Sequence, residues 1–339
     1  MTETPAGPAT MSDVARLAGV SVMTVSNVVN GRAGRVSDDT RARVLAAIES
    51  LAYRVNVPAR QLRQGRSGTI ALAVPDFTSP YYGELAARLA DRLAGHGLRL
   101  VVERTLGAVT EELAVLERSR LDAYDGLLLA LAGGSARDLE ALDPARPMVL
   151  LGERASSPRL DHVAMDNVGG ARLATGLLLD RGATRVAVIG GSLADEPSMS
   201  SLRTRGWLEA HRERGLEPDP ALVVGGGVGL EAGHDAVARL SAAGVAFDAV
   251  LGLTDSAAIG ALAALAEGGR RVPADVQVVG WDATEAARFA VPALTTVDPR
   301  NDAMADEAVR LLLRRLSGET GPAEHVAPPA VLLERATTR

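Results

Sequence analysis

Residues 10–55 show the spacing of apolar residues that is typical of short amphipathic helices. We expect three such segments, each beginning at a hydroxyl side chain that can cap a helix: Thr10, Ser21 and Ser37. Gly19 and the pair Asn30-Gly31 are expected to end the first two. The residues predicted to face inward are Val14, Leu17 and Ala18, then Val25, Val28 and Val29, and finally Val44, Leu45, Ile48 and Leu51.

The pattern changes at Thr69, where short apolar runs begin to alternate with amphipathic helical stretches. This alternation predicts an α/β architecture with parallel strands, and so many strands fit two sheets better than one. The predicted strands are 69–74, 98–102, 127–130, 149–151, 186–189, 222–224, 249–251 and 276–279, and the predicted helices are 82–94, 170–180, 203–214, 231–240 and 256–267. Ligands of such folds bind beyond the carboxyl ends of the strands, which here means residues 75–82, 190–203, 254–255 and 281–282.

Composition narrows the functional classes. The chain of 339 residues contains no Cys and five His, so disulfides, Cys-based zinc sites and thiol nucleophiles are excluded, and neither a metal nor a cofactor is expected. No apolar run approaches the length of a membrane span, and the first twenty residues lack the apolar core of a signal peptide. A cytoplasmic protein that does not contact a membrane is therefore expected.

Charge is distributed unevenly along the chain. Residues 1–66 hold nine Arg and five acids, a net charge of +4, whereas the remainder has a net charge of −10. A basic module on an acidic body suits a DNA-binding domain joined to a soluble sensor, although +4 alone is also ordinary for a small domain.

The segment 11–30 has the chemistry of a helix-turn-helix. Ala15 is small where two helices would cross, Gly19 permits a tight turn, and Ser21 and Thr24 can meet phosphates at the start of the second helix. Exposed residues of that helix could face base edges in a major groove. The alternative is a three-helix bundle with no role in DNA binding.

Three strings occur in order here: DVARLAGVSVMTVSNVVNG, VSDDTRARVLAAIESLAYRVN and ARQL. In their sequence and spacing they resemble the lactose repressor (LacI) family, and the resemblance covers nearly the whole chain. It implies that Val22 and Met23 read bases and that Thr24, Ser26 and Asn30 contact the DNA backbone. Asn27 departs from the pattern, because the family usually has Arg there, but Asn can still bind adenine through two hydrogen bonds.

The connector 56–62 resembles the family's hinge helix, which forms on DNA. Pro58 suits a first helical turn. By this resemblance Ala59 and Leu62 contact DNA, and Leu62 enters the minor groove and kinks the operator. The alternative for Leu62 is a linker leucine that packs on its own domain.

The remainder predicts a two-lobed α/β binding protein, and the resemblance to a periplasmic-binding-protein-like sensor indicates which residues face its cleft. Acids, an arginine and aromatic faces suit a polyhydroxylated or heteroaromatic ligand. Val228 falls where some members carry a stacking aromatic, which weakens any transfer of a particular ligand. The predicted ligand-binding residues are Asp76, Tyr81, Tyr82, Asp166, Arg203, Thr254, Asp255, Trp281 and Asp282, with Trp207 expected in the core and Arg205 in solvent.

Two other classes of protein share parts of this pattern. Residues 227–232 form a G-x-G-x-x-A string, but no acid ends the next predicted strand, so a dinucleotide-dependent enzyme is disfavoured, and no catalytic residues are predicted. A solute-binding protein of a transporter would share the two lobes but would have no use for residues 10–62.

The expected organisation is a disordered tail (1–9), a helix-turn-helix domain (10–55), a hinge (56–68) and a sensor (69–339). Within the sensor we expect a near lobe of about 69–166 and 299–325 and a far lobe of about 167–298 and 326–339. The resemblance implies a homodimer on palindromic operator DNA that represses a catabolic operon until a small molecule, such as a sugar, relieves it. Co-repression is the alternative. Because no leucine heptads follow the sensor, no tetramerising coiled coil is expected.

Overall fold

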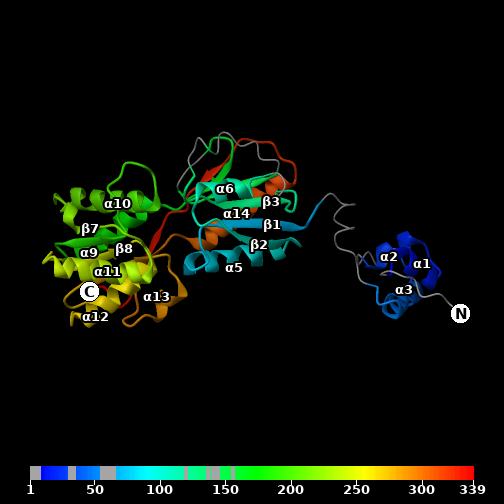
Figure 1. The fold of residues 1–339 in the computed structure, drawn as a ribbon, viewed down its shortest axis with the longest axis horizontal. Coiled ribbons are helices and arrows are strands. Elements are labelled where there is room, and N and C mark those ends of the chain that lie inside the picture. The colour runs from blue at the N-terminus through cyan, green and yellow to red at the C-terminus, as the bar shows by residue number, and fades with distance from the viewer. Residues whose placement is uncertain are drawn as a thin grey trace. The chain divides into compact units, whose positions relative to one another are not determined.

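The chain divides into two compact units, residues 1–67 and 68–339 (Figure 1). The computed structural model describes residues 9–29, 36–53, 66–117, 121–134, 138, 146–153 and 157–339.

The first unit packs three helices, α1 (Met11–Ala18), α2 (Val22–Val29) and α3 (Asp38–Ser50), around a small apolar core. Its fully or almost fully buried side chains are Val14, Ala15, Ala18, Val25, Val44 and Ala47. The predicted caps are confirmed. Thr10 and Asp13 form a reciprocal capping box, and the Ser21 and Ser37 hydroxyls accept the backbone N–H of Thr24 at 3.1 Å and of Thr40 at 3.4 Å.

Two residues expected in this core are instead exposed. Leu17 is 55% exposed and Leu45 is 50% exposed. In α1 the inward stripe follows positions 11, 14, 15 and 18, and in α3 it follows 44, 47, 48 and 51. Both stripes have the spacing i, i+3, i+4, i+7 of one helix face. Ala15 is buried, as predicted for a small residue where two helices cross, and Ala47 holds the place that the prediction gave to Leu45, so these short helices can approach closely.

The second unit contains, in its described part, two six-stranded sheets, which confirms the prediction of two sheets. The first has the order β11-β5-β4-β3-β1-β2, with every neighbouring pair parallel. We call the lobe built on it the near lobe, because it follows the first unit in the chain. Its strands are β1 (Thr69–Val74), β2 (Arg99–Arg104), β3 (Gly126–Ala130), β4 (Met148–Leu151), β5 (Asp161–Val163) and β11 (His325–Val326), and its helices are α5 (Pro80–Ala94), α6 (Val109–Val115) and α14 (Asn301–Leu316).

The second sheet has the order β12-β10-β9-β8-β6-β7, and we call its lobe the far lobe. Only the edge strand β12, among the described strands, pairs antiparallel. The strands are β6 (Val186–Ile189), β7 (Val223–Val224), β8 (Ala249–Gly252), β9 (Gln277–Trp281), β10 (Thr295–Asp298) and β12 (Val331–Leu333). The helices are α9 (Asn167–Asp180), α10 (Met199–Glu213), α11 (Leu230–Ala242), α12 (Asp255–Glu267), α13 (Glu285–Phe289) and the short 3₁₀ turn Pro220–Leu222.

Within residues 157–339, which are described without a gap, the chain passes between the lobes three times. The passages follow β5, β10 and β11, at residues 164–166, 299–300 and 327–330. In Figure 1 the late helix α14 accordingly lies beside the early elements α5 and β3. The last far-lobe segment was expected to start at residue 326. Val326 instead pairs with Val163 in the near-lobe sheet, so the third passage begins at residue 327.

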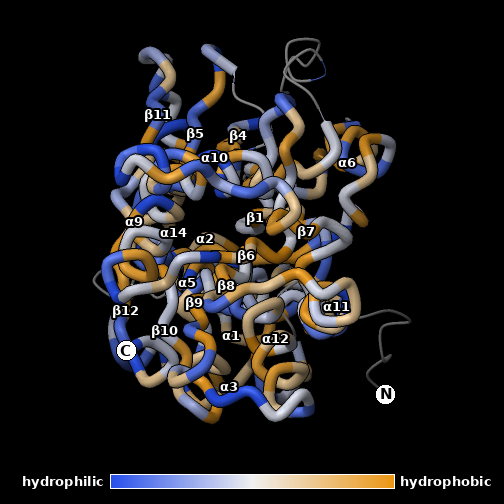
Figure 2. Tube along the Cα trace, turned by 90° about the vertical axis from the view of Figure 1, so that its left-hand side faces the viewer, coloured by the Kyte–Doolittle hydropathy of each residue, from blue (hydrophilic) through white to orange (hydrophobic). Residues whose placement is uncertain are grey.

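Apolar burial holds each lobe together. The strands β1, β3, β4, β6 and β8 are buried along their whole length, as parallel strands covered on both faces must be. Along the helices the hydropathy changes repeatedly, as expected for elements with one buried face (Figure 2). Trp207 is fully buried, as predicted, and its indole N–H donates to Val186 O at 3.0 Å.

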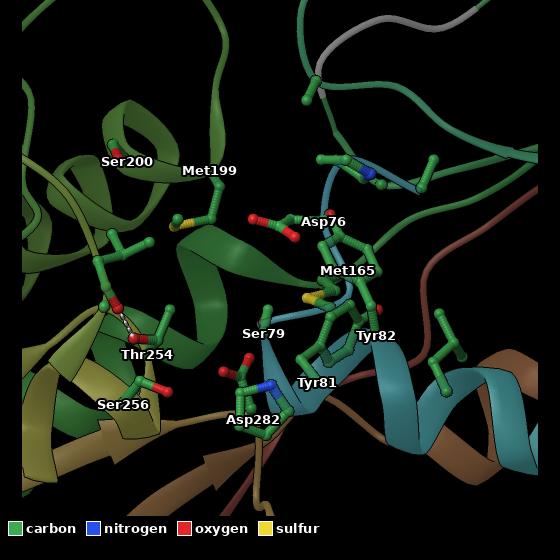
Figure 3. A pocket seen from close by; sticks show the side chains of 18 of the residues that line it. Asp76, Ser79, Tyr81, Tyr82, Met165, Met199, Ser200, Thr254, Ser256 and Asp282 are labelled. Carbon is green, nitrogen blue, oxygen red and sulfur yellow. Dashed lines mark hydrogen bonds between the residues drawn. The ribbon is translucent and has the colours of Figure 1, made fainter. Parts of the chain in front are cut away.

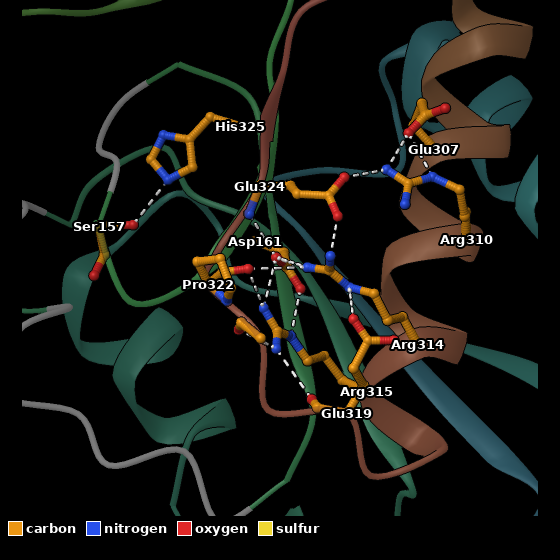
Figure 4. A network of polar contacts seen from close by, with 11 residues as sticks. Ser157, Asp161, Glu307, Arg310, Arg314, Arg315, Glu319, Pro322, Glu324 and His325 are labelled. Atoms are coloured by element: carbon orange, nitrogen blue, oxygen red, sulfur yellow. Dashed lines mark hydrogen bonds and ion pairs between the residues drawn. The ribbon is translucent and has the colours of Figure 1, made fainter.

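A buried carboxylate fixes the C-terminal end of α14 to the near-lobe sheet (Figure 4). Asp161 in β5 is 1% exposed. Its oxygens accept from Arg314 at 2.7 Å, from Arg315 at 2.7 and 3.0 Å, and from the backbone N–H of Glu324 at 2.8 Å. Because β5 and β11 each lead into a passage between lobes, this network anchors two of the three passages.

No helix in the parts of the chain that the structure describes is long and apolar enough to cross a membrane.

Candidate functional site

A cavity of about 720 Å³ lies between the two lobes of the second unit. Loops that follow β1, β3 and β4 form its near-lobe wall, and the start of α10, residues 228–230 and the loops after β8 and β9 form its far-lobe wall. Figure 3 shows Asp76, Tyr81 and Tyr82 on one side, facing Met199, Ser200, Thr254 and Ser256. The cavity therefore lies at the carboxyl ends of the strands, where the sequence predicted a ligand.

Six of the nine predicted ligand-binding residues line this cavity: Asp76, Tyr81, Tyr82, Arg203, Thr254 and Asp282. Asp76, Tyr81 and Tyr82 come from the loop after β1 and the first turn of α5, where the two tyrosine rings meet edge to face with centroids 5.0 Å apart. Thr254 caps α12 by accepting the N–H of Ala257 at 3.0 Å, and its hydroxyl donates to Val228 O at 2.5 Å.

Arg203 occupies the centre of the far-lobe wall and is 2% exposed. Its Nε donates to Asn167 Oδ1 at 2.7 Å, its Nη1 donates to Leu253 O, and its Nη2 lies 3.2 Å from Met165 Sδ. The guanidinium carbon lies 3.9 Å from the ring centroid of Trp281. Burial lowers the pKa of Arg203, while the Asp282 and Glu153 carboxylates act in the opposite direction. The side chain is thus held rigidly before any ligand arrives.

Three predicted residues support the wall rather than line it. Trp281 is fully buried beneath Arg203. Asp255 is fully buried, and its oxygens accept from Thr296 Oγ1 at 2.5 Å and from Thr284 N at 2.7 Å. The Asp166 carboxylate caps α9 by accepting the N–H of Gly169 at 2.9 Å. Of the pair 254–255 only Thr254 lines the cavity, and of the pair 281–282 only Asp282 does.

Two further carboxylates share the cavity with Asp282. Glu153 follows β4 in the near lobe, and burial raises its pKa although Arg203 and a hydrogen bond from Asn167 lower it. Burial also raises the pKa of Asp282. Asp76 lies at a more exposed place, 3.3 Å from Arg104, and hydrogen bonds from Thr78 lower its pKa.

Sequence reasoning missed several lining residues, among them Ser79, Glu153, Met165, Met199, Ser200 and Ser256. Ser79 and Ser256 lie within or beside predicted ligand loops, so their positions could have been inferred. Glu153 follows the predicted strand 149–151 at its carboxyl end, the same signal that identified the other loops.

A loop behind the near-lobe wall is held by one buried acid. Glu112 in α6 is 1% exposed, and its carboxylate accepts the backbone N–H groups of Ala132, Gly133 and Gly134 at 2.7, 3.1 and 2.7 Å. Ala132 lines the cavity, so this carboxylate sets the shape of its wall.

In the first unit the face of α2 that was predicted to read bases is accessible. Val22 is 42% and Met23 is 69% exposed, while Thr24 and Asn27 are half-buried. The exposed Ser21 hydroxyl lies 2.9 Å from that of Thr24, so the two share a hydrogen bond at the helix start. Ser26 is 8% exposed, which leaves it little surface for a phosphate. The predicted DNA contacts Asn30, Ala59 and Leu62 lie outside the described residues.

Comparison with known proteins gives matches to both units. Residues 10–56 match the family described as "Bacterial regulatory proteins, lacI family", and residues 175–338 match the "Periplasmic binding protein-like domain". The chain is 32% identical over 329 residues to the ribose operon repressor of Escherichia coli (strain K12), covering 96% of this chain and 99% of that protein.

Two solved structures resemble it over nearly the whole chain. A complex of the transcriptional regulator CelR with cellobiose has a TM-score of 0.71 at 32% identity and covers 97% of this chain and 99% of that one. The Lac repressor dimer bound to operator and the anti-inducer ONPF has a TM-score of 0.84 at 29% identity and covers 98% of this chain and 99% of that one.

Proposed function

Because this chain belongs to the lacI family of bacterial regulatory proteins, we propose that it is a homodimeric repressor that dissociates from operator DNA when it binds a small molecule. It is a ligand-responsive DNA-binding regulator and not an enzyme. The proposed effector is a sugar or a related metabolite, and the proposed location is the cytoplasm. The observation that carries this proposal is the cavity of about 720 Å³ between two lobes whose chain also includes a helix-turn-helix unit.

The exposed start of α2 supports the DNA-binding role. Val22 and Met23 present apolar surface that can meet a thymine methyl group, and Asn27 can bind adenine. One helix-turn-helix buries little surface and neutralises few phosphates, so tight specific binding calls for two copies on a palindromic site. The related Lac repressor was solved as a dimer on its operator.

The cavity supports the effector-binding role. A ligand shifts an equilibrium only if it binds one conformation better than the other, and a site that draws residues from both lobes senses their arrangement directly. In the proposed mechanism the bound effector changes the lobe arrangement, the hinge segments of the dimer separate, and Leu62 leaves the minor groove.

The test is a gel shift on the DNA upstream of the protein's own gene, with and without a panel of sugars. Arg203→Ala should retain DNA binding and lose the response to ligand. Arg205→Ala is the matched control, because Arg205 lies on the same helix with a 58% exposed side chain. A ligand that strengthens the shift would indicate co-repression, and an absence of any specific shift would exclude the proposed function.

A further inference from the structure

The charges that face the cavity are unbalanced. Among the described residues that line it, the acids are Asp76, Glu153 and Asp282, and the cation is Arg203. Asp76 lies at the exposed end, where Arg104 pairs with it from outside the lining. The interior of the cavity therefore holds two carboxylates facing one guanidinium.

The guanidinium is already engaged by the protein. Each nitrogen of Arg203 is within hydrogen-bonding distance of a protein atom, on Asn167, Leu253 or Met165, and one face covers the Trp281 ring. Recognition of a phosphate or carboxylate by Arg depends on the planar fork of its N–H groups. Here protein atoms engage all three nitrogens, so at most two of the five N–H groups are left for a ligand.

Glu153 completes this arrangement from the opposite lobe. It follows β4, and its side chain is partly accessible because it faces the cavity. Asn167 lies between the two charges. It accepts from Arg203 through Oδ1 at 2.7 Å, and its amide, together with Arg203, lowers the pKa of Glu153, which burial raises. The Asn167 amide thus lies between an acid of the near lobe and an arginine of the far lobe.

We propose that the effector of this chain carries no phosphate or carboxylate group, and that Glu153 is the specificity-determining residue that excludes such groups. This inference rests on the proposed function only in taking this cavity as the effector site. An anionic group placed at Arg203 would also meet Glu153 and Asp282, and repulsion between like charges is strong where water is scarce. A neutral polyol meets no such repulsion, because its hydroxyls can donate to both carboxylates.

The test measures charge selectivity by titration calorimetry on the full chain without DNA. The probes are matched pairs: D-ribose and D-ribose 5-phosphate, D-galactose and D-galacturonate, cellobiose and cellobionate. In every pair that binds, the neutral member should bind the wild-type protein about tenfold more tightly or better. A phosphorylated or acidic member that binds as tightly as its neutral partner would overturn the inference.

A charge-removing variant assigns the effect to Glu153. Glu153→Gln removes the negative charge but keeps a side-chain oxygen that can accept from Asn167. Without that charge, the preference for the neutral members should narrow by about tenfold. Glu111→Gln, an exposed acid of the same lobe that does not line the cavity, should leave the preference unchanged. Unchanged selectivity in Glu153→Gln would overturn the role of Glu153.

If none of the sugars binds, the same titration is carried out with inorganic phosphate as the ligand. Tighter phosphate binding by Glu153→Gln than by the wild type and Glu111→Gln supports the exclusion, and equal binding refutes it. Because no step uses DNA, a failure of charge selectivity and a failure of operator binding are observed separately.

Discussion

Substitution of Glu112 by Gln tests how the near-lobe wall of the cavity is held. The Glu112 carboxylate accepts three successive backbone N–H groups, from Ala132, Gly133 and Gly134, in a place where its side chain is 1% exposed. Gln is nearly the same size but replaces one acceptor oxygen with an NH₂ donor. At least one backbone N–H then loses its acceptor and faces another donor.

The size of the effect follows from these contacts. A buried donor without a partner costs about 1–3 kcal/mol, and hydrogen bonds to a charged group are worth about 1.5–3 kcal/mol rather than about 1. We therefore expect Glu112→Gln to lower the free energy of unfolding by about 2–4 kcal/mol. At about 2–4 °C per kcal/mol for domains of comparable size, the melting temperature should fall by about 4–16 °C.

The assay is thermal unfolding of the full chain followed by circular dichroism, together with calorimetric titration of a ligand that binds the wild type. Ligand affinity should fall as well, because Leu131 and Ala132 form part of the cavity wall. Glu111→Gln is the control, since it makes the same chemical change one residue away on the exposed side of α6. Equal melting temperatures for the two variants would refute the argument that the carboxylate holds the loop.

The remaining predictions concern acid–base behaviour, lobe anchoring and DNA recognition. Burial raises the pKa of Asp255 from 3.8 to about 6, so the folded state holds this proton more tightly, and stability should fall by about 3 kcal/mol as pH rises from 4 through 6. Urea unfolding across that range should show this slope in the wild type and not in Asp255→Asn. Asp161→Ala should cost about 3–5 kcal/mol in the same assay, because it removes the buried carboxylate that Arg314 and Arg315 share, and a loss below 1 kcal/mol would contradict this. Asn27→Ala should relax base preference at one symmetric pair of positions in a binding-site selection, whereas uniform weakening would indicate a phosphate contact. Leu62→Ala should weaken specific binding much more than nonspecific binding, and equal losses would argue against a wedge in the minor groove.

The pattern of apolar residues predicted the central strands of both sheets well. The observed bounds of β1 and β6 are the predicted ones, because each is a buried run bounded by glycine, proline or arginine. The two-residue strand β11 and the three-residue strand β5 were not among the predicted strands. Strands of that length carry too short a pattern to recognise, and pairing with neighbouring strands of the sheet stabilises them.

The candidate site was predictable at the level of loops and less so at the level of side chains. Parallel topology brings every β-to-α loop to the same edge, so the loops at 75–82, 254–255 and 281–282 could be identified from the sequence alone. Which side chain of a loop faces the cavity depends on local backbone geometry that the sequence does not display. Asp282 illustrates this, because its φ of 114° is rare for a residue with a side chain, and that conformation turns it away from the core.

Two asparagines connect the effector site to the passages between lobes. Asn167 is the first residue of α9, directly after the first passage, and its Oδ1 accepts from Arg203 at 2.7 Å. Asn301 is the first residue of α14, directly after the second passage, and its Nδ2 donates to the backbone oxygen of Asp282 at 2.8 Å. Both are at least nine-tenths buried. A ligand that moves Arg203 or Asp282 must therefore also move the segments whose torsion angles set the lobe arrangement. The same hydrogen bonds are involved in ligand binding and in lobe movement. They provide a physical reason for a ligand to bind one lobe arrangement more tightly than the other.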